Sequence, residues 1–145
     1  MSNWENTIFV EVMEDGRLPS KAHMTDAGFD LYASSDITIC KGDIVKHPLN
    51  IRLDLPDGTW ARIETKSGLG SKGMLVWAGV IDQTYRGIPH VIATNLSDTP
   101  ICIKKGDKIA QMTLNPHHNY YQVAQVESVS TDTDRGTSGF GSSGR

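Results

Sequence analysis

Turn-forming residues recur along this chain at short intervals, and this feature limits its possible folds more than any other. Glycine, proline, asparagine, aspartate and serine cluster at residues 34–36, 41–43, 56–58, 95–98 and 105–107. Between them lie short runs rich in isoleucine, valine, threonine and tryptophan, at residues 7–12, 51–55, 60–65, 91–94, 101–103 and 121–126. Many short strands separated by closely spaced turns predict an all-β domain, either a sandwich or a jelly roll.

The local patterns support strands and argue against long helices. Residues 51–55 alternate between apolar and charged side chains, which is the period of a half-buried strand. Residues 39–43 and 103–107 resemble each other and predict tight turns with glycine at a positive φ. The best helical candidate, residues 67–73, contains three glycines and could make two turns at most.

Length and charge narrow the class of protein. The 145 residues fit one compact domain, and an apolar content of 38% is compatible with oligomerisation because a small core buries a modest share of the surface. The formal charge is -3 without a basic block, so we expect no nucleic-acid partner. No apolar run approaches the ~20 residues of a membrane span, so we expect no membrane partner.

The N-terminus and the cysteines indicate the compartment. The first residues lack the charged-then-apolar pattern of a signal peptide. Cys40 and Cys102 show no CxxC spacing, and we expect both to be half-buried strand thiols. His117 and His118 are neighbours, which point apart on a strand and make a poor metal site. We expect an intracellular, cytoplasmic protein, with a nuclear or viral-host setting left open.

The last stretch changes composition. Residues 128–145 are mostly serine, threonine, glycine and aspartate, which favours a disordered tail. However, Arg135 precedes a run of glycines, and Phe140 stands between Gly139 and Gly141. Arginine binds phosphate oxygens, glycines let N–H groups approach an anion, and a flat ring can stack on a base. The tail therefore carries groups that a nucleotide site needs.

Two further segments could meet a charged ligand. Asp30 faces away from Phe29 and Leu31, as either a solvated strand aspartate or an oxygen ligand for a hard cation. Residues 66–73 follow a strand and offer a cation, a hydroxyl and a helix start, which suits phosphate but also fits a plain loop.

Residues 79–87 are the most informative segment. Asp82 ends an apolar strand and enters a turn, with Tyr85 three residues later. Val80 and Asp82 would share one strand face, so the carboxylate is either a turn former or part of a site. Residues 105–112 predict a strand in which side chains alternate between faces, so Gln111 lies on the face opposite Ala110. From this pattern alone, Gln111 is a surface glutamine.

The segments at residues 27–33, 66–73, 79–87, 105–112 and 135–144 resemble, in this order, the five signature motifs of trimeric dUTP diphosphatases. Residues 18–22 are similar to the start of that family. The resemblance implies a jelly-roll domain at residues 1–127, three copies in a threefold-symmetric ring, and a flexible Gly/Ser-rich C-terminal arm at residues 128–145 that closes over an active site. It implies hydrolysis of dUTP to dUMP and pyrophosphate with Mg²⁺, which limits uracil incorporation into DNA and supplies dUMP for thymidylate synthesis.

The resemblance also implies roles for single residues. Asp82 would be the general base that orients the attacking water, and Tyr85 would be the platform under the deoxyribose. Asp30 would hold the magnesium shell, through water. The phosphate groups of the substrate would be bound by Lys66, Ser67, Gly68 and Gln111. Uracil would be bound by a hairpin that contains Val76, Gly79, Val80 and Ile81. The arm would add substrate contacts from Arg135, which holds the γ-phosphate, Phe140, which stacks on uracil, and Gly139, Gly141 and Ser142.

The chain also departs from the family pattern. Lys66 and Lys108 stand where most members carry arginine, and Trp77 is large for its place in the uracil hairpin. Lysine cannot make the two-pronged contact of arginine, so phosphate binding would differ in detail. Two alternatives stay open, namely a dCTP deaminase or bifunctional relative of the same fold, and a non-catalytic trimeric binding module.

Overall fold

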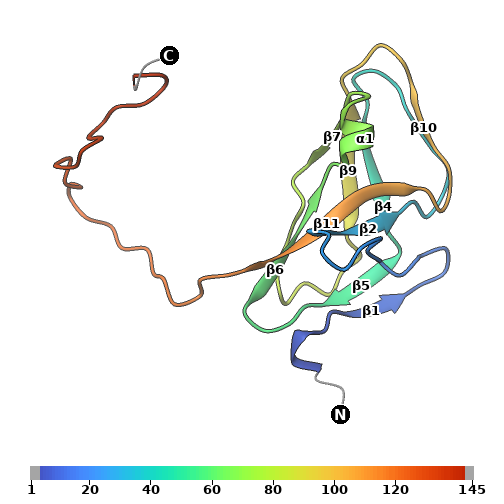
Figure 1. Ribbon diagram of the computed structural model, residues 1–145, viewed down its shortest axis with the longest axis horizontal. Helices are drawn as coiled ribbons and strands as arrows, with labels where there is room; N and C mark the ends of the chain where they lie inside the picture. Colours follow the sequence, from blue (N-terminus) through green and yellow to red (C-terminus); the bar gives the residue numbers. More distant parts are fainter. Residues whose placement is uncertain (1–3, 143–145) are drawn as a thin grey trace.

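The computed structural model describes residues 4–142, which form a strand-rich body and a long C-terminal segment (Figure 1). A short 3-10 helix, η1 (Trp4–Asn6), and one α-helix of four residues, α1 (Ser67–Gly70), are the helices of this range. None of its helices is long and apolar enough to cross a membrane. The strands are β1 (Phe9–Val12), β2 (Gly28–Tyr32), β3 (Ile37–Ile39), β4 (Ile44–Pro48), β5 (Ile51–Asp54), β6 (Thr59–Glu64), β7 (Met74–Trp77), β8 (Val80–Ile81), β9 (His90–Asn95), β10 (Ile101–Ile103) and β11 (Lys108–Pro116).

The named strands pair antiparallel in four sheets. The largest has the order β2-β11-β6-β8, the next has the order β4-β9-β7, and β1-β5 and β3-β10 form two pairs. β11 lies between β2 and β6, so Gln111 stands opposite both Asp30 and Glu64. This register brings three distant parts of the sequence into one row. The expectation of an all-β fold is confirmed.

One hydrophobic core joins the two larger sheets. Leu31 on β2, Ile63 on β6 and Met112 on β11 are buried in the same cluster as Val91 and Ala93 on β9. The alternation expected for residues 51–55 is confirmed, because β5 buries every second side chain. The two expected glycine turns are confirmed as well, with φ of 79° at Gly42 and 86° at Gly106.

The cysteine expectation is wrong. Cys40 and Cys102 are both exposed, and Cys40 lies just beyond β3. Ile39 pairs with Ile101, and these two side chains fill the core. Because successive side chains on a strand point to opposite faces, the neighbouring thiols point to solvent.

The strand expected at residues 121–126 is absent. The last strand ends at Pro116, and residues 117–142 leave the body as an irregular segment (Figure 1). Tyr121, Val123 and Val126 are exposed there, since none of the strands within residues 4–142 pairs with them. A strand pattern without a partner strand cannot satisfy its backbone hydrogen bonds. Residues 143–145 of the expected arm and residues 1–3 of the expected domain lie outside the described residues.

Candidate active site

Asp30, in the middle of β2, is held between two lysines. Its residue surface is only 7% exposed. Lys66, just before α1, donates to Oδ1, and the Nζ atom of Lys108 lies 2.9 Å from Oδ2. The pairing of β11 with β2 shifts between Lys108 and Ala110, and such a bulge can redirect a side chain. The alternative of a solvated strand aspartate is therefore wrong.

These contacts set the charge state of Asp30. Burial alone would raise the pKa of this carboxyl, because an apolar environment disfavours the charged form. The hydrogen bonds and positive charges of Lys66 and Lys108 outweigh burial and hold the pKa of Asp30 below its ordinary value. The group is thus a carboxylate with a cation at each oxygen.

The expected phosphate contacts lie next to this carboxylate. Lys66 is the extended residue before α1, and Ser67 and Gly68 begin the helix with exposed surfaces. Gln111 stands opposite Asp30 and donates from Nε2 to the carbonyl oxygen of Thr65, 3.1 Å away. The structure therefore brings Asp30, Gln111 and Lys66 together, in a row that crosses β2 and β11 and reaches the residues just after β6.

Residues 78 and 79 form a turn with an exposed main-chain edge. Ala78 has a φ of 55° and Gly79 a φ of 87°. The amide of Ile63 donates to the carbonyl of Gly79 at 2.8 Å, and a Cβ added to Gly79 would lie 2.3 Å from the carbonyl oxygen of Ile63. No side chain fits there, so this close approach requires glycine.

The hairpin expected around residues 76–80 is wrong in its pairing. β7 pairs with β9, whereas β8 pairs with β6. The two positive φ values turn the chain from one sheet to the other, so β7 and β8 do not form a ladder with each other. The amide of Val76 donates to the hydroxyl of Thr65 at 2.9 Å, and the carbonyl of Thr65 accepts from Gln111.

Asp82 and Tyr85 follow directly on the next turn. β8 ends at Ile81, so the exposed Asp82 belongs to the turn, as expected from its place in the sequence. Its carbonyl accepts from the amide of Tyr85 at 3.1 Å. Tyr85 borders a pocket of about 270 Å³ lined by Lys46, Ile63, Ala78, Gly79, Val80, Ile81, Tyr85, Ile88, Pro89, His90 and Ile92.

The Tyr85 ring lies against Gly87. A Cβ at Gly87 would be 2.3 Å from the Tyr85 hydroxyl oxygen and 2.5 Å from Cζ. The hydroxyl also donates to the carbonyl of Ile88 over a long 3.4 Å. The ring is therefore placed on a backbone that carries no side chain.

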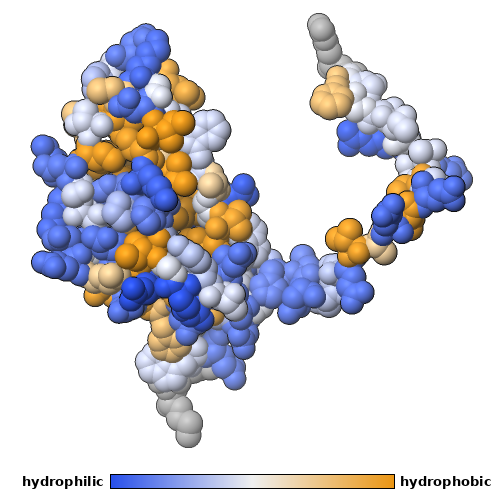
Figure 2. Space-filling model, turned by 180° about the vertical axis from the view of Figure 1, so that it is seen from behind, coloured by the Kyte–Doolittle hydropathy of each residue, from blue (hydrophilic) through white to orange (hydrophobic). Residues whose placement is uncertain are grey.

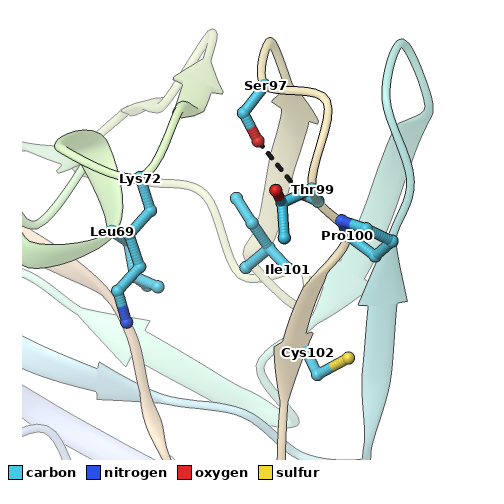
Figure 3. Close-up of a pocket in the computed structure, with 7 residues that line it drawn as sticks. All are labelled: Leu69, Lys72, Ser97, Thr99, Pro100, Ile101 and Cys102. Carbon is cyan, nitrogen blue, oxygen red and sulfur yellow. Dashed lines mark hydrogen bonds between the residues drawn. The ribbon is translucent and has the colours of Figure 1, made fainter.

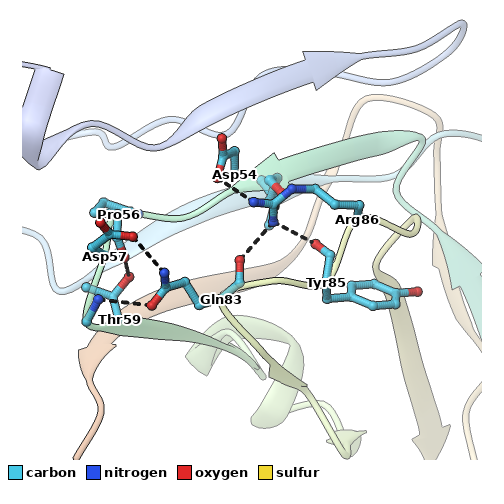
Figure 4. A network of polar contacts seen from close by, with 9 residues as sticks. Asp54, Pro56, Asp57, Thr59, Gln83, Tyr85 and Arg86 are labelled. Atoms are coloured by element: carbon cyan, nitrogen blue, oxygen red, sulfur yellow. Dashed lines mark hydrogen bonds and ion pairs between the residues drawn. The ribbon is translucent and has the colours of Figure 1, made fainter. Parts of the chain in front are cut away.

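Two residues that the sequence argument missed anchor this turn (Figure 4). Arg86 donates to the carbonyl of Gln83 at 2.8 Å and to Asp54 at 2.7 Å. The Gln83 side chain bonds Asp57, Gly58 and His117. Arg86 and Gln83 stand within the motif at residues 79–87, but nothing in the sequence identifies their distant partners Asp54, Asp57, Gly58 and His117, which lie more than 20 positions away.

The arm residues are not brought to the other groups within one protomer. Arg135 bonds only locally, from Nε to the carbonyl of Ser138 at 2.9 Å, and Phe140 is fully exposed. Gly139, Gly141 and Ser142 lie in the same segment, which stands away from the body (Figure 1).

The donor set suits a loosely held hard cation. Within residues 4–142, no three His, Cys, Asp or Glu side chains are grouped to hold a metal ion. Mg²⁺ keeps several of its waters and is commonly bound by one or two carboxylates together with substrate phosphates. A carboxylate offers about four acceptor positions, so Asp30 can accept from a water while both lysines stay in place. The residues present therefore fit magnesium held through water.

A larger pocket lies elsewhere. It measures about 480 Å³ and is lined by none of the expected site residues (Figure 3). Leu69 and Lys72 form one wall, and Ser97 and residues 99–102, in the loop before β10 and in β10, form the other.

Comparisons with known proteins agree with these motifs. The dUTPase family model matches residues 14–144. The deoxyuridine 5'-triphosphate nucleotidohydrolase of Candida glabrata is 39% identical over 133 residues, which cover 91% of this chain and 92% of that protein. The Pol polyprotein of Ovine maedi visna related virus is 37% identical over 137 residues, and the match covers 94% of this chain but only 12% of that longer protein.

Solved structures show the same fold. The Staphylococcus bacteriophage 80alpha dUTPase with dUPNHPP superposes with a TM-score of 0.88 at 24% identity, covering 97% of this chain and 99% of that chain. A mutant dUTPase from phage phi11 of S. aureus, described with a structural Mg(II) ion, has a TM-score of 0.76 at 24% identity over 85% of this chain and 98% of that chain. The fold is thus the jelly roll expected from the sequence. With a family match over nearly its whole length, this chain belongs to the dUTPase family.

Proposed function

We propose that this protein hydrolyses dUTP to dUMP and pyrophosphate with Mg²⁺, in a homotrimer whose sites draw on several chains. The observation that carries the proposal is the arrangement of residues 78–85. The Ala78–Gly79 turn and Tyr85 border one pocket. The exposed Asp82 follows directly on β8, whose two residues line the same pocket. Such activity would limit uracil incorporation into DNA and supply dUMP for thymidylate synthesis.

Asp82 is the proposed base. Hydrolysis at the α-phosphorus needs a placed water and charge neutralisation more than covalent catalysis. Asp82 follows β8 on a turn held by Gln83 and Arg86, so its carboxylate has a defined position. It would orient the attacking water and accept its proton.

The pocket beside Tyr85 is the proposed site for base and sugar. Uracil presents two acceptors and one N–H donor, and the main chain of Val76, Gly79, Val80 and Ile81 can offer the complementary pattern. A site that leaves polar groups unpaired rejects the wrong base by ~10⁴-fold or more. The Tyr85 ring would pack against C2′ of the sugar and leave no room for a hydroxyl.

The group around Asp30 is the proposed phosphate and metal site. Lys66, Ser67, Gly68 and Gln111 would contact phosphate oxygens. Asp30 would hold the water shell of a magnesium ion that, when bound, neutralises charge on the phosphates. One of the two lysines would then leave Asp30 and bind a phosphate oxygen. Lys66 is the better placed of the two, because it directly precedes α1.

The arm is proposed to complete the site of another chain. Arg135 would hold the γ-phosphate, Phe140 would stack on uracil, and Gly139, Gly141 and Ser142 would close around the ligand. Residues 128–145 form this flexible arm, and residues 1–127 the jelly-roll domain. The separation of the arm from the body of its own chain supports this arrangement (Figure 1).

An exposed apolar sheet face supports the trimer. Ile44 on β4 and Leu75 on β7 both stand opposite Thr94, and Trp77 stands opposite Ile92. Opposite residues share a face of the sheet, and Ile44, Leu75 and Trp77 are 75%, 38% and 48% exposed. Seen from behind, hydrophobic residues form a band on the body (Figure 2). Closed cyclic symmetry is the usual way to cover such a face.

The deciding experiment is a pyrophosphate-release assay with dUTP, with and without Mg²⁺. dCTP, dTTP and UTP serve as competitors, and an ammonia assay with dCTP tests for deamination. We expect Mg²⁺-dependent release from dUTP and no ammonia. Light scattering should give three times the 15.9 kDa chain mass. An inactive chain, or an active monomer at micromolar concentration, would contradict the proposal. An intracellular location is part of the same proposal.

A further inference from the structure

In the sequence, Gln83 lies between the proposed base, Asp82, and the proposed sugar platform, Tyr85. Its side chain runs toward the turn between β5 and β6, whereas the Tyr85 ring points in the opposite direction (Figure 4). Nε2 donates to Oδ1 of Asp57 at 2.8 Å. Oε1 accepts from the amide of Gly58 at 3.0 Å and contacts Nε2 of His117 at 2.8 Å. An amide fits this place because one end donates while the other accepts twice.

His117 is the first residue after β11 and begins the segment, residues 117–127, that leads from the body to the arm, so we call it the arm root. Its own amide donates to the carbonyl of Gly58 at 2.9 Å, and the indole of Trp60 donates to the carbonyl of Pro116 at 3.1 Å. The direction in which the arm leaves the body is therefore fixed at the same β5–β6 turn that Gln83 binds. Gln83 is the one side chain of residues 82–85 that bonds both this turn and the arm root.

The other end of the Asp82 turn is fixed independently. Arg86 donates to the carbonyl of Gln83 at 2.8 Å and to Asp54 at 2.7 Å. The main chain of Gln83 is thus held from one side and its side chain from the other. A shift of this residue would move Asp82 and would release His117 at the same time.

We infer that Gln83 is a positioning residue that couples the Asp82 turn to the root of the C-terminal arm. The inference rests on the proposed function, because it assigns the water-orienting role to Asp82 and a closing role to the arm. A displacement of about 1 Å at a reacting group can cost ~10²-fold in rate. The bonds at His117 fix where the chain leaves the body, so their loss would widen the range of directions open to the arm and make its closure over a site rarer. Both effects would follow from one side chain.

The first test is protection of the arm. Between residues 117 and 144, Arg135 is the only lysine or arginine, so trypsin cuts the arm at one bond. With α,β-imido-dUTP and Mg²⁺ bound to the full chain, cleavage after Arg135 should slow. In Gln83→Met, which keeps the size but loses the amide, most of this protection should disappear. Thr84→Ala is the matched control, because Thr84 is an exposed neighbour whose side chain bonds none of the described residues, and it should keep the protection.

The second test separates coupling from simple damage. Gln83→Met is measured for kcat/KM on dUTP in the full chain and in a chain ending at Asp134. Coupling predicts that the loss, about tenfold in the full chain, is at least about threefold smaller in the truncated one. A purely structural role predicts the same loss in both. Equal losses, with arm protection unchanged, would overturn the inference while leaving the proposed function intact.

A rescue variant guards against misfolding. Gln83→Glu places a second carboxylate against Asp57, and Asp57→Asn then supplies the missing N–H donor. The double variant should recover kcat/KM and arm protection that Gln83→Glu alone loses. If the double variant is no better than the single one at equal melting temperature, the contact does not position the turn. A parent chain without any ligand protection would refute arm closure itself, and the inference with it.

Discussion

The ammonium group of Lys108 lies 2.9 Å from the Oδ2 of Asp30, across a bulge in the pairing of β11 with β2. This contact and the one from Lys66 hold the pKa of Asp30 below its ordinary value against the opposing effect of burial. A carboxyl with a lowered folded pKa stabilises the fold above its unfolded pKa of ~3.9 and loses that contribution as pH falls through the folded value.

Lys108→Met should therefore make the fold more sensitive to acid. Without this lysine the pKa of the buried Asp30 rises, so its contribution is lost at a higher pH. Circular dichroism between pH 6 and pH 2 should show an acid-unfolding midpoint shifted upward. Lys104→Met is the control, since Lys104 and its partner Asp36 are largely exposed at 3.5 Å and such pairs stabilise little. An equal shift in both variants would contradict the argument.

Asp82→Asn should keep the fold and ligand binding but lower kcat by ~10²–10⁴-fold, because the side chain keeps its size and loses its basicity. Steady-state kinetics on dUTP measure the loss, and isothermal titration with α,β-imido-dUTP measures binding. Asp98→Asn, at an exposed ion pair with Lys41, should leave kcat unchanged. Turnover near the parent rate would remove Asp82 from its proposed role.

Gly87→Ala should weaken the discrimination between dUTP and UTP. Its Cβ would fall 2.3 Å from the Tyr85 hydroxyl oxygen, so the ring must move away from its place. The ratio of kcat/KM for the two nucleotides should fall in the same direction as in Tyr85→Ala. Tyr85→Phe should keep the ratio, because the bond that it removes, to Ile88, is long. An unchanged ratio in Gly87→Ala and Tyr85→Ala would argue against a sugar platform.

Ending the chain at Asp134 should leave a folded trimer with kcat/KM lowered by ~10²-fold or more. Stacking of Phe140 and the charge-assisted contact of Arg135 would together supply a few kcal/mol, at about 1–3 and 1.5–3 kcal/mol each. The melting temperature should not change, since the arm bonds locally and stands away from the body (Figure 1). Activity close to that of the full chain would show that the arm takes no part in the reaction.

The patterns that were predictable from the sequence are local ones. Alternation at residues 51–55 and the glycine turns at Gly42 and Gly106 are set by neighbours in the chain, and the structure has them as expected. The position of Asp82 at the end of a strand is of the same kind.

Long-range partners could not be predicted in the same way. The contact of Lys108 with Asp30 depends on a bulge, and that of Gln83 with His117 depends on where two distant turns meet. The pairing of β7 and β8 with different sheets has the same cause. Residues 121–126 carry a strand pattern that finds no partner strand in the described part of the chain. Each of these contacts and pairings depends on how distant segments are placed against one another in the fold, and a single sequence does not show that placement.

The turn at Ala78 and Gly79 also bears on how this site can evolve. In the proposed role, the groups that read the base belong to the main chain, and every amino acid carries the same N–H and C=O. Substitutions at residues 76–78 can then accumulate, as the exposed Trp77 illustrates, without altering the pattern offered to the base. A new base preference would instead require the backbone to take another path, through an insertion, a deletion or the loss of Gly79, whose close approach to Ile63 admits no side chain. Base selectivity that depends on main-chain groups therefore tolerates many side-chain substitutions and is hard to change by any single one.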